Sequence, residues 1–143
     1  MNPEPDHAAH LESGRLGRLC TVRLRPNQDL VEGIEVLCRE MDLSHAVVRA
    51  AVGSLNDAVF EAGGRELKVA GPGLEIILLS GEITSGTKGA PRAKLFGAVC
   101  DQEGQVIGGR FLPGRNIICI TLELLLQEWL PDGATQPTTR PEV

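Results

Sequence analysis

Cysteine and histidine are the residue types of this sequence best suited to metal binding or catalysis, and the cysteines are widely spaced. Cys20, Cys38, Cys100 and Cys119 form no C-x-x-C pair, the spacing found in zinc sites and redox centres. Their neighbours are mostly apolar. We therefore expect the four thiols to be small hydrophobic side chains, buried and reduced.

The three histidines are also dispersed. His45 is the only one within the predicted folded unit, where its place at a helix-to-strand turn favours a surface or capping role. His7 and His10 could meet on one helical turn as a metal pair, but they lie in a segment that we expect to be loosely held. Ser54 and Asp57 suggest a nucleophile, yet no His or Lys base is near, so turn hydrogen bonds explain them better. These patterns predict that the protein is not an enzyme and holds no cofactor.

One helix is predicted, and it should begin after Asp29. Asp29 can cap the first turn, and Glu32 follows three residues later, as in a capping box. One face at helical spacing is apolar and should be buried; it consists of Leu30, Ile34, Leu37, Cys38 and Met41. Three glutamates, Glu32, Glu35 and Glu40, should face water together with Arg39.

All other segments with a periodic apolar pattern are predicted to be β-strands. Alternating or apolar runs bounded by Gly, Pro and Asp predict strands over 21–25, 46–52, 57–62, 66–70, 74–84, 94–101, 105–111 and 116–127. The first turn in this series is expected at Gly53 and Ser54. The Gly108-Gly109 pair precedes no helix, so it predicts close backbone packing rather than a phosphate loop. The fold class is α+β: a mostly antiparallel sheet of about seven to eight strands with one main helix.

The last strand carries more apolar surface than one helix can cover. Ile118, Ile120, Leu122, Leu124 and Leu126 are expected to form one unbroken apolar face, and most of the opposite face is apolar too. The segment 76–79 is also apolar on both faces. Either the sheet curls onto itself or a partner subunit covers it, and we expect both.

Length and composition bound the remaining possibilities. The 143 residues fit one domain, predicted over 18–130, between a loosely held arm (1–17) and a disordered tail (131–143). The formal charge of −5 and the 3% of aromatic residues are unfavourable for nucleic-acid binding, which draws on basic faces and base stacking. Residues 1–10 do not resemble a signal peptide, and the apolar run 117–126 is too short to span a bilayer, so we expect a cytoplasmic location.

Four segments, in order and at sensible spacing, resemble the plant and prokaryote conserved (PPC) domain. They are the helix start DLVEGI (29–34), the turn VGSLNDA (52–58), the strand LEIILLSG (74–81) and the hairpin DQEG (101–104) followed by VIGG (106–109). The order strand, helix, then a series of strands is similar as well.

The resemblance implies an antiparallel sheet with a packed helix, usually assembled as a homotrimer. Single-domain prokaryotic members are described as candidate DNA-binding proteins, whereas plant members carry the domain beside an AT-hook. Here Gly14-Arg15 and Gly17-Arg18 lack the proline-flanked Arg-Gly-Arg core of such a hook. The resemblance is therefore only weak support for a DNA-binding role of this chain.

The resemblance also implies a set of site residues. Many prokaryotic members place three histidines around the hairpin, and the corresponding residues here are Lys94, Phe96 and Arg110. None of these is an ordinary zinc ligand, so the family's metal site should be absent. Lys94 and Arg110, with Arg92 or Arg115, could instead bind a carboxylate or phosphate. The alternative is that these cations pair with Glu75, Asp101 or Glu103, or face solvent.

The sequence is therefore compatible with two functions. The first is a non-enzymatic, homotrimeric interaction module associated with DNA or transcription, whose duplex binding is weak and carried by Arg92, Lys94, Arg110 and Arg115. The alternative is a protein that binds a small anion or metabolite at Lys94 and Arg110. An unrecognised enzyme is disfavoured by the shortage of His, Tyr and reactive Cys.

Overall fold

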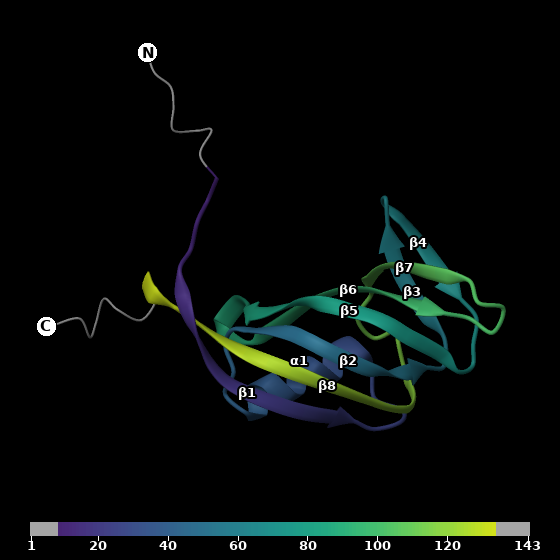
Figure 1. Ribbon diagram of the computed structural model, residues 1–143, viewed down its shortest axis with the longest axis horizontal. Helices are drawn as coiled ribbons and strands as arrows, with labels where there is room; N and C mark the ends of the chain where they lie inside the picture. The colour runs from purple at the N-terminus through teal and green to yellow at the C-terminus, as the bar shows by residue number, and fades with distance from the viewer. Residues whose placement is uncertain (1–8, 134–143) are drawn as a thin grey trace, which may run out of the picture.

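The computed structural model describes residues 9–133, which form one α-helix and a single eight-stranded antiparallel sheet (Figure 1). The elements are β1 (Gly14–Leu24), α1 (Leu30–Glu40), β2 (Ala46–Leu55), β3 (Ala58–Ala62), β4 (Arg65–Val69), β5 (Leu74–Ser85), the 3-10 turn η2 (Thr87–Gly89), β6 (Pro91–Cys100), β7 (Val106–Phe111) and β8 (Ile118–Pro131). The strand order is β1-β8-β2-β5-β6-β7-β3-β4, so the last strand lies between the first two. The predicted α+β class and the place of the helix after the first strand are confirmed.

The helix begins where the sequence predicts. The Asp29 carboxylate accepts hydrogen bonds from the backbone N–H groups of Val31 and Glu32 at 3.0 and 2.9 Å, which satisfies donors that have no partner within the helix. The predicted apolar face is confirmed: Leu30, Ile34 and Cys38 are fully buried, and Leu37 and Met41 pack partly buried against the core. At 11 residues, α1 is far shorter than the roughly 20 apolar residues that a membrane-spanning helix needs.

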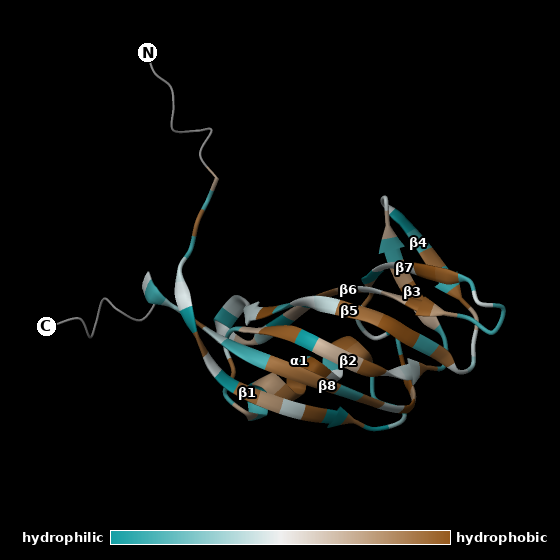
Figure 2. Ribbon diagram, in the orientation of Figure 1, coloured by the Kyte–Doolittle hydropathy of each residue, from teal (hydrophilic) through white to brown (hydrophobic). Residues whose placement is uncertain are grey.

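The sheet curls around α1, which packs against both β1 and β6. In Figure 1 the helix lies behind β2 and β8, so it covers one face of the sheet. Residues directly opposite each other on neighbouring strands share a face. A row crosses the sheet under the helix and consists of Gly53 and the buried residues Leu122, Ile76 and Val99; we call this side the inner face. Figure 2 shows hydrophobic residues running along β8, β2 and β5.

Asn116, just before β8, is fully buried and connects several segments. Its side-chain oxygen accepts from the Val59 N–H at 2.9 Å, while its amide nitrogen donates to the carbonyls of Val59 and Leu112 at 3.1 and 2.9 Å. Its backbone N–H donates to the Asp29 carboxylate at 2.8 Å, and its carbonyl accepts from the Leu30 N–H. The helix cap, β3, the end of β7 and the start of β8 are therefore tied together at one residue.

Two strand predictions were wrong because of close packing and a bulge. Gly53 and Ser54 lie within β2, since β2 approaches β8 so closely that a Cβ at Gly53 would collide with the Thr121 carbonyl. The predicted unbroken apolar face of β8 is interrupted: Ile120 is 66% exposed. The register between Gly53 and Leu55 on β2 advances by four residues on β8, from Leu122 to Ile118, and Ile120 lies in this irregular segment.

The predicted limits of the folded unit were too narrow at the N-terminal side. β1 begins at Gly14, so it takes up part of the predicted arm 1–17, and its residues from Gly14 to Leu16 pair with the end of β8. Arg18 fixes this region: its guanidinium donates to the Glu128 carboxylate and to the carbonyls of Met41 and Asp42 at the end of α1. Residues 1–8, His7 among them, and 134–143 of the predicted tail lie outside the described residues.

The expectation of four buried thiols holds for Cys38 alone. All four cysteines are free, but Cys20, Cys100 and Cys119 are only half-buried. Burial raises the pKa of the Cys38 thiol to about 11, and nearby Cys20 and Glu35 act in the same direction. At neutral pH Cys38 is therefore an inert, protonated core residue.

We predict that Asn116→Ala lowers the free energy of unfolding by about 2 to 3 kcal/mol, because it leaves the buried Val59 N–H without an acceptor. Urea denaturation at fixed protein concentration measures the loss. Gln102→Ala, in the exposed β6–β7 turn, is the matched control and should change stability by less than about 0.5 kcal/mol. Equal effects of the two substitutions would contradict the role given to Asn116.

Candidate functional site

A pocket opens where β7 stops pairing with β6. β7 pairs with β6 only from Phe96 to Cys100, so the stretch of β6 before Phe96 has one edge without a strand neighbour. α1 packs beside this edge, and the Glu35 carboxylate accepts a hydrogen bond from the Ala93 N–H at 2.9 Å. A helix side chain thus satisfies a backbone donor that β7 does not reach, and the space left between them is the pocket.

The pocket has a volume of about 230 Å³ and is rich in charge. Its lining residues are Glu35, Glu82, Thr84, Arg92, Ala93, Lys94, Arg110 and Pro113. Three of the four cations singled out in the sequence, Arg92, Lys94 and Arg110, therefore meet at one place. We call this the β6-edge pocket.

The fourth predicted cation, Arg115, does not join them. Its guanidinium forms an ion pair with the Glu66 carboxylate at 2.7 Å, and it lines a separate pocket of about 420 Å³ beside β3 and β4. The predicted cluster of four cations is thus a cluster of three. Arg115 lies in the loop between β7 and β8, and its side chain reaches Glu66 on β4, a direction that sequence position alone did not reveal.

The ion pairs considered as an alternative do not form, whereas Arg92 and Lys94 are exposed to solvent, as the other part of that alternative expected. Within residues 9–133, none of Glu75, Asp101 and Glu103 lies within 4.0 Å of a side-chain nitrogen of Arg92, Lys94 or Arg110. Asp101 instead accepts from the N–H groups of Glu103 and Gln105 in its own turn, at 3.0 and 2.8 Å. The three cations of the β6-edge pocket make no side-chain hydrogen bond to any described residue, and the buried Nε of Arg110 has no acceptor.

Sequence reasoning missed the two carboxylates of the pocket. Glu35 was expected to face water, because helical periodicity cannot tell that a strand edge lies beside that face of α1. Glu82 stands directly opposite Lys94 in the β5–β6 register, a pairing that depends on the irregularity between Ile76 and Leu78. Neither residue could be placed before the register was known.

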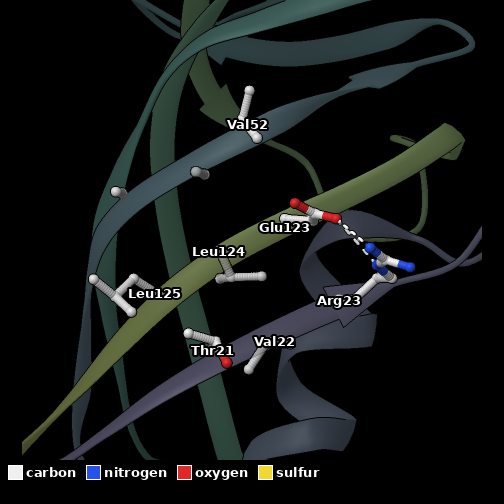
Figure 3. Close-up of a pocket in the computed structure, with 9 residues that line it drawn as sticks. Thr21, Val22, Arg23, Val52, Glu123, Leu124 and Leu125 are labelled. Atoms are coloured by element: carbon white, nitrogen blue, oxygen red, sulfur yellow. Dashed lines mark hydrogen bonds and ion pairs between the residues drawn. The ribbon is translucent and has the colours of Figure 1, made fainter.

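A third and larger pocket lies on β1, β8 and β2. It has a volume of about 500 Å³, and its lining includes Thr21, Ala50, Val52 and Leu125 as well as the ion pair between Arg23 and Glu123 at 2.6 Å (Figure 3). Figure 3 shows the Arg23 and Glu123 side chains directed towards each other across β1 and β8. Apart from this pair, the lining is mostly apolar.

The face of the sheet away from α1, the outer face, carries further exposed apolar side chains. Val52 alternates with Gly53 of the inner row, and both Leu78 and Phe96 alternate with the inner pair Leu79 and Gly97. Val52, Leu78 and Phe96 are 63%, 57% and 44% exposed, and Ile77 beside Leu78 is 52% exposed. We call these four residues the outer apolar patch. Burial of such large apolar side chains is the main driving force for association between proteins.

Comparison with protein-family models places the fold among known domains. Residues 11–130 match the model of the Plants and Prokaryotes Conserved (PCC) domain, also written PPC. The chain belongs to this family. The resemblance read from the four sequence segments is thereby confirmed, and the match covers nearly all described residues.

Solved structures from three prokaryotes share the PPC fold of this chain. A hypothetical protein from Salmonella is 26% identical with a TM-score of 0.71, covering 84% of this chain and 83% of that one. A PPC protein from Pyrococcus horikoshii is 20% identical with a TM-score of 0.71, at 85% coverage of each chain. A metal-containing protein from Archaeoglobus fulgidus is 22% identical with a TM-score of 0.72, covering 86% and 87%.

The PPC domain is also found inside longer chains. A protein of Synechococcus sp. (strain JA-3-3Ab), named Bifunctional protein GlmU, is 35% identical over 133 residues. The match covers 87% of this chain but 20% of that protein, so this chain spans about one fifth of the relative's length.

Lys94, Phe96 and Arg110 stand at the positions where the resemblance places metal-binding histidines. Phe96 and Arg110 are directly opposite each other on β6 and β7, and Lys94 lies two residues before Phe96 on the same face. Histidines here would converge, so the register accounts for the family's site, whereas an ammonium, a phenyl ring and a guanidinium supply no ordinary ligand. No group of three or more His, Cys, Asp or Glu among residues 9–133 is placed to hold a metal ion.

Asp57 makes a loop hydrogen bond, as its place in the sequence predicts. The Asp57 carboxylate accepts from the Gly71 N–H at 2.8 Å and so fixes the loop between β4 and β5. The carbonyl of His45 accepts from the Trp129 N–H at 3.0 Å, which joins the start of β2 to β8.

We predict that tag-free protein, purified without chelator, contains less than about 0.1 equivalent of zinc or other transition metal, because cations replace the family's ligands. Elemental analysis by plasma mass spectrometry measures this. The matched control is the triple variant Lys94→His, Phe96→His and Arg110→His, which should gain metal affinity. Stoichiometric metal in the natural sequence, removed by chelator together with thermal stability, would contradict the prediction.

Proposed function

We propose that this chain is a non-enzymatic interaction module that works as a cytoplasmic homotrimer and contacts duplex DNA only weakly. The observation that carries the proposal is the outer apolar patch, Val52, Ile77, Leu78 and Phe96, which lies on the face that α1 does not cover. Self-association would remove this surface from water.

A homo-oligomer is favoured because the patch continues into the apolar pocket on β1, β8 and β2 at Val52. Obligate interfaces bury roughly 2,000 Å² or more and are more hydrophobic than ordinary surface. The number three comes from the resemblance to the PPC family. The four free cysteines fit the reducing cytoplasm.

A binding role fits better than an enzymatic one. The β6-edge pocket offers cations and carboxylates but no histidine, serine or cysteine. The occurrence of the same domain as about one fifth of a longer bifunctional protein also fits a module that assembles or recruits other parts.

Structural neighbours support a contact with DNA, whereas the acidic net charge of this chain is unfavourable for it. Structures from Bacteroides thetaiotaomicron and Ralstonia eutropha with the same fold are named as candidate DNA-binding proteins, at 15% and 21% identity. In this chain the net charge is −5, and Glu35 and Glu82 stand among the cations of the β6-edge pocket. A local group of Arg92, Lys94 and Arg110, repeated by symmetry, could still contact several phosphates.

We predict that the wild-type protein elutes with a mass close to three times its 15.3 kDa chain mass in light scattering at micromolar concentration. Val52→Lys should shift the mass to that of the monomer, because it places an ammonium in the patch. The fold should tolerate this change, since Val52 is opposite Glu123. Leu67→Lys is the matched control: Leu67 pairs with Phe60 on the inner face of the edge strand β4, so the assembly should persist. A wild-type monomer would refute the assembly.

We predict weak, non-specific duplex binding whose log affinity falls with log salt by about 0.9 per phosphate neutralised. Fluorescence anisotropy at two salt concentrations with two unrelated duplexes measures the slope. Lys94→Glu and Arg110→Glu should each weaken binding, whereas Arg115→Gln, already ion-paired in the wild type, should have a smaller effect. Nanomolar, sequence-selective binding at physiological salt, or binding that survives both charge reversals, would contradict this prediction.

A further inference from the structure

Arg110 lines the β6-edge pocket without a side-chain partner among the described residues. It lies between Phe96 on β6 and Glu61 on β3 in the sheet register, and it is half-buried. Its Nε is inaccessible to water and has no acceptor, and no other nitrogen of its guanidinium is hydrogen bonded within residues 9–133. A buried charged donor without an acceptor is costly, so such a group in a folded protein calls for an explanation.

The other arginines near acidic groups show what Arg110 lacks. Arg18, Arg23 and Arg115 each meet a carboxylate, Glu128, Glu123 and Glu66 respectively, at 3.1 Å or less. Arg110 lines the same pocket as Glu35 and Glu82, yet no ion pair forms among the charged residues of that pocket. The pocket thus keeps its cations and carboxylates apart, and its formal charge is +1 (three cations minus two carboxylates).

Separated charges of both signs indicate a ligand with two kinds of polar group. A carboxylate or phosphate would take the donors of Arg110 and Lys94, for which the planar guanidinium is well suited. The carboxylates of Glu35 and Glu82 would then accept from an amino or hydroxyl group of the same ligand. A bare polyanion would instead be repelled by both glutamates.

The size of the pocket restricts the ligand further. Its volume of about 230 Å³ lies below the roughly 300–1,000 Å³ of sites for drug-sized molecules, so a nucleotide would not be enclosed. A duplex backbone is excluded from the interior for the same reason and can touch only the rim.

We propose that the β6-edge pocket binds a small metabolite that carries one carboxylate or phosphate together with an amino or hydroxyl group, with Arg110 as its principal anion-binding residue. Lys94 and Arg92 add charge at the anion end, and Glu35 and Glu82 bind the donor end. This site goes beyond the proposed assembly and does not depend on it, because every residue involved comes from one chain.

Isothermal titration with four probes tests the proposal: inorganic phosphate, glycerol 1-phosphate, acetate and β-alanine. We expect millimolar or tighter binding, with glycerol 1-phosphate tighter than inorganic phosphate or β-alanine tighter than acetate, since only the larger member of each pair brings a donor group. Arg110→Gln should weaken binding about 10- to 100-fold, the range expected for loss of charged hydrogen bonds.

Two controls keep the test decisive. Arg115→Gln removes an equal charge from a different pocket and should leave every affinity unchanged. Lys94→Gln alters an exposed side chain that the fold does not need, and it should also weaken binding if Arg110→Gln fails to fold. Unliganded thermal unfolding of each variant shows whether the fold is intact.

Three results would overturn the proposal. The first is absence of heat or chemical-shift change with all four probes at 10 mM or about that concentration, a level at which even weak sites are occupied. The second is equal binding by wild type and a folded Arg110→Gln variant. The third is equal affinity within both probe pairs, which removes the role of Glu35 and Glu82. If a short duplex binds through Arg110 while none of the four probes binds, the anion donors serve DNA and not a metabolite, and the proposal also fails.

Discussion

The buried amide of Asn116 is the point on which the arrangement of the sheet depends. It binds both backbone groups of Val59 and a carbonyl after β7, and its own N–H binds the carboxylate of Asp29 that caps α1. One residue thereby fixes the start of the last strand relative to the helix and to the distant half of the sheet. Because β8 lies between β1 and β2, its starting position sets the register of the central strands. A buried polar network can do this only when all of its members are satisfied.

Within residues 9–133 a single helix, α1, packs against the eight-stranded sheet, and this imbalance explains both surfaces of interest. α1 fills the inner curve and reaches the free edge of β6, where Glu35 binds the Ala93 N–H and leaves the charged pocket. Nothing within the described chain covers Val52, Leu78 and Phe96 on the opposite face. Phe96 lies beside Arg110, so the apolar patch and the charged pocket are neighbours. Assembly could therefore influence access to the pocket.

The parts of the fold that could be predicted are those controlled by local sequence. The Asp29 cap and the apolar stripe of α1 follow from helical spacing, and the β6–β7 hairpin follows from its turn. The exposure of Ile120 and the continuation of β2 through Gly53 could not be predicted from the sequence, because both arise from contacts between β2 and β8. At the site, resemblance located Lys94 and Arg110. Glu35 could not be predicted as a pocket residue, because it lines the pocket only through the packing of α1 against a strand edge.

The central claim is that copies of this chain cover the outer apolar patch, and hydroxyl-radical footprinting tests it at the side chains themselves. Leu78 and Phe96 should be labelled slowly in the wild-type protein and several-fold faster in Val52→Lys, because dissociation exposes them. Leu67, on the other face, should be labelled equally in both proteins, and Leu11, which is 86% exposed, gives the rate of an open side chain. If Leu78 and Phe96 are labelled in the wild-type protein as fast as in the variant, the patch is open and the account is wrong.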